Sequence, residues 1–475
     1  MTKEEFLRYK KKQKKRRKRL LRWILVLLAA VLVLAIVDYG INRSGRKTGG
    51  GAGKNGTVPT PPAVATPSPS PSPSPSPTPT PSPTPTPTPT PNVVSMVAVG
   101  DNLYDWYMLE DGYHKEDGSF DFSGNYDPIS KYLQMADWAV VNQETPLGGD
   151  EGYVGSSVEM DYIKSRTRWG SYHGYSTFNT PNEVALELMR AGFNVVTSAT
   201  NHSSDYGWKA VRNTLEFWAN YPDITVLGIH DSQESQDTIS VLEKYGIRIA
   251  CLNYTYGLNL SSATDEAPYS IDRLSEQRVR SDVARAKEMA DFVVVFVHWG
   301  EEYQMSSNSY QKRYRNLFLE VGVDAVIGAH PHIVQPMEWV EREDGHRMVV
   351  YYSLGNFISM FKNYKCELEG MAYLEFYKGE DGTYIKEGTM IPLVNHWEYD
   401  AGVFGKRKNF TVYALQDYTE ELGKTHGCLH FGEGTSFSYK AMQDLAVKMW
   451  GDHIKTVSEE EFVENERFQR ENAEP

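Results

Sequence analysis

The chain has 475 residues and a formal net charge of −13, so it is long enough for one large or two smaller domains. Residues 1–54 carry sixteen Lys and Arg against three acids, which leaves a net charge of −26 for the rest of the chain. A main body that acidic disfavours nucleic acid as a partner, and the three cysteines do not indicate a disulfide framework.

The N-terminal part combines a basic segment with an apolar one. Residues 1–22 are rich in Lys and Arg, and residues 23–37 form an unbroken apolar run. With its flanks, taken as 23–41, this run approaches the ~20 residues needed to cross a bilayer. We interpret it as a single transmembrane signal anchor with a cytoplasmic N-terminus and an extracellular main body. A cleaved signal peptide is the alternative, but no small-x-small cleavage site follows the run.

Residues 42–92 are predicted to be a disordered linker, first Gly-rich and then rich in Pro, Ser and Thr. Pro alternates with Ser or Thr through most of 59–91, a composition that cannot bury a core and favours polyproline II. At ~3.1 Å per residue, such a segment is a semi-rigid spacer on the order of 100 Å long. We therefore expect a globular head held away from the membrane, as in a thick cell wall.

From residue 93 onward, apolar runs of strand length alternate with amphipathic helical segments, which predicts an α/β (α+β) layered sandwich. We expect strands over 93–99, 137–141, 193–198, 246–252, 292–297, 325–327 and 348–352. We expect helices over 129–135, 181–191, 279–290, 311–321 and 441–450. Residues 104–129 and 151–178 are interpreted as loops. The main domain is placed at 93–395, and 396–475 is predicted to be a partly packed extension with a charged tail.

Polar side chains follow most of the predicted strands, where ligands bind in open parallel sheets. Each of them alone also fits an ordinary turn, but together they form a metal-competent set: Asp101, Asn142, Glu144, Asn201, His202, His298, His330 and His332. Carboxylate, amide and imidazole groups without a thiolate favour Mn, Fe or Zn over a structural zinc site. The sequence therefore predicts a divalent metal centre at this edge.

Other polar residues near these strand ends are candidates for catalysis or substrate binding. Asp205, three residues after His202, is a candidate catalytic residue, with helix capping as the alternative. Arg166, Arg168 and His173, in the loop 151–178, are candidates for binding an anionic substrate. Solvated loop charges are the more common interpretation of such residues.

Six blocks carry a resemblance to a known family. They are G-D at 100–101, N-Q-E-T-P-L at 142–147, N-H-S-S-D-Y-G at 201–207, H-W-G-E-E-Y at 298–303, G-A-H-P-H-I-V-Q-P at 328–336 and Y-S-L-G-N-F at 352–357. In this order they resemble the poly-γ-glutamate capsule biosynthesis (CapA) family over roughly residues 93–395. That family is similar in turn to the calcineurin-like metallophosphoesterases, which hold two metal ions.

The resemblance implies roles for individual residues. One metal would be surrounded by Asp101, Glu144 and His332. The other would be held by Asn201, His298 and His330, with Glu144 or Asn142 bridging the two. His202 would contact the scissile phosphate or its leaving group. Glu302 and Asn356, in two further matched blocks, are predicted to contact substrate.

The chain departs from the family pattern at three positions. Leu103 stands where the phosphoesterase Asp-x-His motif has its histidine, Glu144 stands for a bridging aspartate, and Thr200 replaces a more usual asparagine. Our first hypothesis is a membrane-anchored, extracellular metal-dependent hydrolase of capsule or related surface-polymer biosynthesis, working with other capsule-synthesis membrane subunits. The alternatives are a non-catalytic scaffold for polymer export or tethering and, third, a nucleotidase-type scavenger.

Overall fold

The computed structural model describes residues 92–149, 174, 177–402 and 406–464. The predicted anchor and nearly all of the predicted linker lie outside these residues, as do Arg166, Arg168 and His173. None of the helices in the described ranges is long and apolar enough to cross a membrane.

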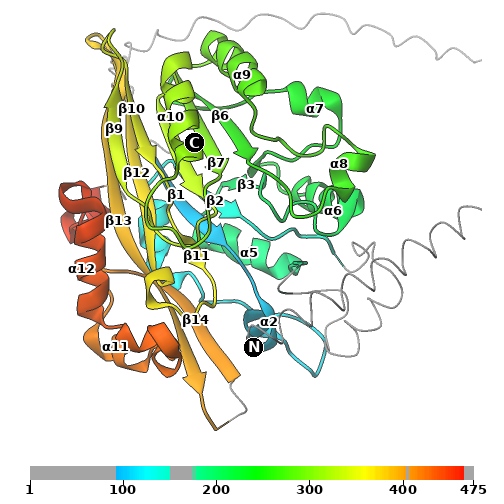
Figure 1. The fold of residues 1–475 in the computed structure, drawn as a ribbon, viewed down its shortest axis with the longest axis vertical. Coiled ribbons are helices and arrows are strands. Elements are labelled where there is room, and N and C mark those ends of the chain that lie inside the picture. Colours follow the sequence, from blue (N-terminus) through cyan, green and yellow to red (C-terminus); the bar gives the residue numbers. More distant parts are fainter. Residues whose placement is uncertain (1–91, 150–173, 175–176, 403–405, 465–475) are drawn as a thin grey trace, which may run out of the picture. The chain divides into compact units, whose positions relative to one another are not determined.

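The main body is built on two mixed β-sheets (Figure 1). The first has the strand order β14-β13-β12-β1-β2-β3-β4, with β11 paired in parallel to β1. Its strands are β1 (Val93–Asn102), β2 (Trp138–Gln143), β3 (Val195–Thr197), β4 (Thr225–Leu227), β11 (Asn356–Ile358), β12 (Leu368–Gly379), β13 (Gly382–Asp400) and β14 (Lys406–Ala414). Strands β1 to β4 are parallel, whereas β12 to β14 are antiparallel additions. The domain boundary predicted at residue 395 therefore falls inside β13.

The second sheet has the order β5-β6-β7-β8-β10-β9. Its strands are β5 (Ser240–Lys244), β6 (Ile247–Thr255), β7 (Phe292–His298), β8 (Ala325–Ala329), β9 (Met337–Glu341) and β10 (Arg347–Tyr351). The four central strands are parallel and the two edge strands are antiparallel. The predicted strands over 246–252, 292–297, 325–327 and 348–352 correspond to the central strands β6, β7, β8 and β10.

Side-chain alternation along β7 shows how the sheets are layered. Phe292, Val294 and Phe296 belong to the large core that also contains the side chains of β1 and β12. The intervening Val293 and Val295 pack with α9 and α10 in a second core. Because successive side chains point to opposite faces, β7 is buried on both sides, which explains its continuous apolar sequence.

The described part of the chain contains ten α-helices. They are α2 (Trp106–Gly112), α3 (Ser130–Gln134), α5 (Asn182–Ala191), α6 (Gly207–Trp218), α7 (Gln233–Asp237), α8 (Ser262–Glu266), α9 (Glu276–Met289), α10 (Ser309–Val321), α11 (Glu420–Thr425) and α12 (Tyr439–Trp450). Short 3₁₀ helices cover η2 (Asp127–Ile129), η3 (Tyr364–Cys366), η4 (Gly427–His430), η5 (Gly432–Ser436) and η6 (Gly451–His453). Helix α12 packs on β12 and β13 (Figure 1).

Helix α2 is a correction to the sequence-based expectation of a loop over 104–129. The Asp105 side chain caps the helix by accepting hydrogen bonds from the backbone N–H groups of Tyr107 and Met108. Met108 and Leu109 are buried in the core. With only seven residues, this helix is too short to show a clear amphipathic period in the sequence.

Candidate metal centre

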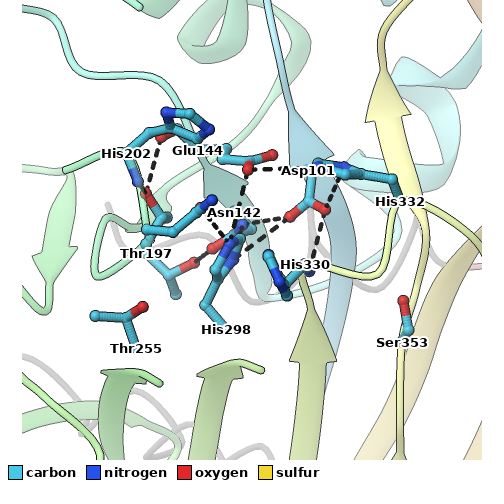
Figure 2. A network of polar contacts seen from close by, with 12 residues as sticks. Asp101, Asn142, Glu144, Thr197, His202, Thr255, His298, His330, His332 and Ser353 are labelled. Atoms are coloured by element: carbon cyan, nitrogen blue, oxygen red, sulfur yellow. Dashed lines mark hydrogen bonds and ion pairs between the residues drawn. The ribbon is translucent and has the colours of Figure 1, made fainter. Parts of the chain in front are cut away.

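The carboxyl ends of both sheets meet at one cluster of buried polar side chains (Figure 2). Asp101 and Asn142 come from β1 and β2, and His298 is the last residue of β7. Asn201 and His202 follow β3, whereas His330 and His332 lie in the turn after β8. Side chains separated by more than 200 positions therefore converge where ligands bind in parallel sheets.

Asp101 is held by a close contact between β1 and the turn before β11. Its backbone N–H donates to the carbonyl oxygen of Gly355 over 3.1 Å. A Cβ atom at Gly100 would lie only 2.0 Å from that oxygen, so only glycine permits this approach. The Asp101 carboxylate accepts hydrogen bonds from Asn142 Nδ2 at 2.7 Å and from the backbone N–H of His330 at 3.1 Å.

His298 is locked in one tautomer by two amides. Its Nδ1 lies 3.3 Å from Asn142 Nδ2, which can only donate, and its Nε2 lies 2.8 Å from Asn201 Oδ1, which can only accept. The side chain is fully buried. Burial, followed by the neighbouring imidazoles, lowers the pKa of His298 well below its usual value. His298 is therefore neutral, and both of its ring nitrogens are engaged by amides.

Glu144 is the carboxylate that this cluster leaves without a hydrogen bond in the described structure. Its carboxylate is buried, and within the described structure neither oxygen has a hydrogen-bond partner. Its nearest imidazole nitrogens are His298 Nε2 at 3.7 Å and His332 Nε2 at 3.8 Å. Burial, and then the neighbouring Asp101 carboxylate, raise the pKa of Glu144 well above its usual value.

A divalent cation fits this arrangement. Ligand atoms of Glu144, His330 and His332 all lie within 4.8 Å of one another. His330 Nδ1 is a further buried atom for which the described structure shows no hydrogen-bond partner. Burial of a charged carboxylate that accepts no hydrogen bonds costs several kcal/mol of folding free energy. A bound cation would offset this cost. The donor set of carboxylate and imidazole suits Mn, Fe or Zn.

The two histidines of the turn have unusual backbone conformations. Both have positive φ, 99° at His330 and 55° at His332, which is rare for residues other than glycine. Burial lowers the pKa of His330 to about 3, helped by the charges of nearby imidazoles. Burial also lowers the pKa of His332, but the Glu144 and Asp101 carboxylates raise it to about 10. Strain of this kind is typical of sites whose geometry is fixed by surrounding structure.

Contacts in the described structure link the two ligand sets that the resemblance implies. His332 of the first set lies 3.3 Å from Asp101 Oδ2 and 3.8 Å from Glu144 Oε1. In the second set His298 Nε2 lies 2.8 Å from Asn201 Oδ1, and the rings of His298 and His330 lie 4.8 Å apart. The group of Glu144, His330 and His332 joins residues of both sets.

His202 and Asp205 form a buried pair beside the cluster. His202 Nδ1 lies 2.7 Å from Asp205 Oδ2, which also accepts from the backbone N–H of Phe178 at 2.8 Å. Asp205 does not cap α6, since that helix begins after Tyr206 without a side-chain cap. His202 Nε2 lies 3.3 Å from Asn259 Nδ2. His202 is therefore oriented from both sides.

The predicted substrate contacts occupy different positions. Glu302 is exposed and lines a cavity of about 500 Å³ that also contacts His202 and His332. Asn356 is fully buried, and its Oδ1 lies 2.9 Å from His332 Nδ1. Asn356 thus supports a histidine and does not line this cavity.

Sequence reasoning missed two further groups. Thr197 Oγ1 donates to Asn142 Oδ1 over 2.9 Å, and Asn259 contacts His202 as described above. Thr197 ends a predicted apolar strand and Asn259 lies in a loop without a matched block, so nothing marked either residue.

A second group with metal-ligand chemistry is satisfied internally. Glu367, His426 and Cys428 are buried and close together. His426 Nε2 lies 2.9 Å from the carbonyl oxygen of Asn395, and His426 Nδ1 accepts from the backbone N–H of Cys428 at 3.1 Å. Both imidazole nitrogens therefore have backbone partners, which indicates a structural network. All three cysteines of the chain are free and buried.

Solved structures similar to this chain include the calcineurin-like phosphoesterase YfkN from Bacillus subtilis, at 14% identity and a TM-score of 0.34 over 63% of this chain and 90% of that one. A hypothetical protein from Thermus thermophilus matches at 11% identity with the same TM-score, over 63% of this chain and 97% of that one. Likeness at this level does not establish a shared fold or a shared site.

Sequence relatives are more informative. The capsule biosynthesis protein CapA of Bacillus anthracis is 25% identical over 270 residues, which are 56% of this chain and 60% of that protein. The PGA biosynthesis protein CapA of Bacillus subtilis is 26% identical over 303 residues, which are 64% of this chain and 72% of that protein. The profile of the bacterial capsule synthesis protein PGA_cap family matches residues 95–360, more than half of the chain. This chain therefore belongs to the PGA_cap family of bacterial capsule synthesis proteins.

Proposed function

We propose that this chain is a metal-dependent hydrolase of phosphoester-type bonds that serves the biosynthesis of capsule, poly-γ-glutamate or a related surface polymer. The observation that carries the proposal is the buried Glu144 carboxylate, which lacks a hydrogen-bond partner in the described structure and lies beside His330 and His332. The capsule-related part is supported by the names of the two Bacillus relatives.

Glu144, His330 and His332 would hold a divalent ion, with Asp101 close to His332 and His298 close to Glu144. A second ion, as the resemblance implies, would draw on Asn201, His298 and His330, in place of the hydrogen bond that now joins Asn201 to His298. When bound, such ions supply Lewis-acid stabilisation of the charge that develops on the ester.

His202 is the proton donor in this proposal. Its Nδ1 is paired with Asp205, so Nε2 is the nitrogen that would meet substrate, in place of its present contact with Asn259 Nδ2. Protonated His202 would deliver a proton from Nε2 to the leaving oxygen, which contributes roughly 10²–10⁴-fold in general acid catalysis. Asp205 would stabilise the imidazolium, and the Asn259 amide, which cannot accept the Nε2 proton, would give way to the leaving oxygen.

We propose that the catalytic domain lies outside the cell membrane, behind a single span at 23–41 and the Pro-rich linker. The proposal rests on the basic block at 1–22 and on the apolar run that follows it. An anionic surface polymer and other capsule-synthesis membrane subunits are the proposed partners.

The test is hydrolysis of bis(4-nitrophenyl) phosphate by the full-length chain loaded with Mn²⁺, with bound metal measured by mass spectrometry. We expect His202→Ala to lower the rate at least ~100-fold while keeping its metal. The control is His114→Ala, which changes an exposed histidine outside the site. A chain that binds no metal and hydrolyses nothing would instead be a non-catalytic scaffold for polymer export or tethering.

A further inference from the structure

A cavity of about 500 Å³ opens beside the candidate metal centre, a volume typical of small-molecule sites. We call it the rim cavity. Two of its walls are the predicted site residues His202 and His332. Its apolar lining comprises Leu103, Phe178, Leu260, Tyr303, Met360 and Phe361.

Exposed apolar side chains concentrate at the mouth of this cavity. In the described structure, Leu260 is 44% exposed and Tyr303 is 49% exposed, although both are large hydrophobic residues. Both residues line the cavity. Exposed apolar groups around a concave site indicate ligand binding rather than core packing.

Tyr303 is held in place at a cost in backbone energy. Its φ of 64° is a rare conformation for a bulky side chain. The backbone N–H of Tyr303 donates to the carbonyl oxygen of Pro331 over 2.8 Å, in the turn that carries the two histidines. Its ring lies 6.2 Å from the His332 ring and 5.9 Å from the Phe361 ring. The fold therefore fixes an aromatic wall against a predicted metal ligand.

The charged groups of the rim cavity are acidic. Asp105 and Glu302 line it, and no Lys or Arg is found among its lining residues in the described part of the chain. Asp105 caps α2, and burial raises its pKa to about 6 against the charges of Arg407 and Lys362, so the repulsive group is the exposed Glu302. Free carboxylates of a substrate would meet repulsion here, in addition to the repulsion from Glu144.

We propose that the rim cavity is a subsite for an apolar, uncharged group of the ester substrate, such as an aryl or alkyl group next to the scissile bond. This inference rests on the proposed function and names the substrate class of the same site. A bare polyanion such as poly-γ-glutamate would not place its carboxylates in this cavity. The hydrolysed bond instead joins the ester centre to an apolar group.

The test compares benzylphosphonate with 4-carboxybenzylphosphonate, which adds one carboxylate to the same ring. Their binding to the full-length, Mn²⁺-loaded chain is measured by titration calorimetry. We expect benzylphosphonate to bind about tenfold more tightly, because the carboxylate of the second probe meets an acidic wall. Glu302→Gln should reduce this difference. Equal affinity, tighter binding of the carboxylated probe, or no binding of either would overturn the subsite.

Tyr303→Gly provides a second arm, because glycine adopts the positive φ without strain and the variant should fold. We expect it to weaken benzylphosphonate binding about fivefold or more, and to leave methylphosphonate binding unchanged. The matched control is Tyr384→Ala, at an exposed tyrosine of β13. Equal losses for both phosphonates would contradict the aromatic wall.

The two proposals fail in different ways. A preference for benzylphosphonate without hydrolysis of any phosphoester would overturn the proposed function alone. Hydrolysis without that preference would overturn the subsite alone.

Discussion

His332 Nδ1 lies 2.9 Å from Asn356 Oδ1, on the strand that pairs with the strand of Asp101. The Asn356 amide cannot be turned around, because its Nδ2 donates to the carbonyl oxygens of His332 at 3.2 Å and Cys366 at 3.4 Å. His332 Nδ1 must therefore carry a hydrogen, so Nε2, which lies 3.8 Å from Glu144 Oε1, is the nitrogen that would give up its proton to bind a metal. A buried amide thus selects the nitrogen of His332 that can bind a metal.

Asn356→Ala should weaken metal binding without abolishing the fold. Partners that orient a metal-binding histidine are typically worth about 10–100-fold in metal affinity. We expect a loss of that size in the Mn²⁺ affinity measured by titration calorimetry. Asn220→Ala, at an exposed asparagine of another element, should change nothing. Unchanged metal affinity in Asn356→Ala would show that Asn356 serves packing alone.

The strands and their polar ends were predictable because the sequence carries local signals for them. The apolar run at β7 and the short one at β8 predicted buried parallel strands, and both form. The rule that ligands collect at carboxyl ends then placed Asp101 and His298 at one edge, where the structure has them.

Other features depend on contacts that no local pattern encodes. Asn356 is the hydrogen-bond partner of His332 Nδ1. Its residue type does not reveal this role, because a polar residue at a strand end can face either substrate or core. The antiparallel addition of β13 and β14 depends on pairing across the sheet edge, so the readable pattern ended near residue 395. The metal-ligand grouping depends on the positive φ of His330 and His332, which residue types do not predict.

Asp205→Asn should lower turnover more than substrate binding. The carboxylate lies 2.7 Å from His202 Nδ1 and would stabilise the imidazolium form. Asparagine keeps the size but removes the charge, so we expect kcat on bis(4-nitrophenyl) phosphate to fall on the order of 10²-fold with a small change in KM. Asp265→Asn, at an exposed aspartate bonded to Ser261, is the control. Equal losses in kcat and in bound metal would assign Asp205 a structural role instead.

Gly100→Ala should damage both the fold and the metal centre. The new Cβ would lie 2.0 Å from the backbone oxygen of Gly355, so β1 and β11 must separate. We expect about 2–3 kcal/mol of lost stability in urea unfolding, together with weaker metal binding, because Asp101 is the next residue. Gly257→Ala, where a Cβ meets nothing within 4 Å, should change stability by less than about 0.5 kcal/mol. A neutral Gly100→Ala would contradict the close contact.

Removal of metal should make stability fall as pH rises from 7 to 8.5. In the folded chain the pKa of Glu144 is raised well above its usual value, chiefly by burial, and that of His332 is raised to about 10, chiefly by Glu144 acting against burial. The Glu144–His332 pair then holds one proton that the unfolded chain has released. Because the folded state binds more protons, rising pH favours unfolding, by up to about 1.4 kcal/mol per pH unit.

The two imidazoles with lowered pKa act in the opposite sense only below a pH of about 6.5, so they do not cancel this trend. The measurement is the midpoint of thermal unfolding of EDTA-treated protein across this pH range. Mn²⁺ should flatten the slope of the unfolding midpoint against pH, because the bound ion replaces the proton of the Glu144–His332 pair. Glu144→Gln should flatten this slope in the absence of metal. Part of the slope should persist in the variant, because burial also raises the pKa of Glu367 and Glu369. A midpoint that rises with pH in the EDTA-treated protein would mean that Glu144 is compensated by something other than a bound cation.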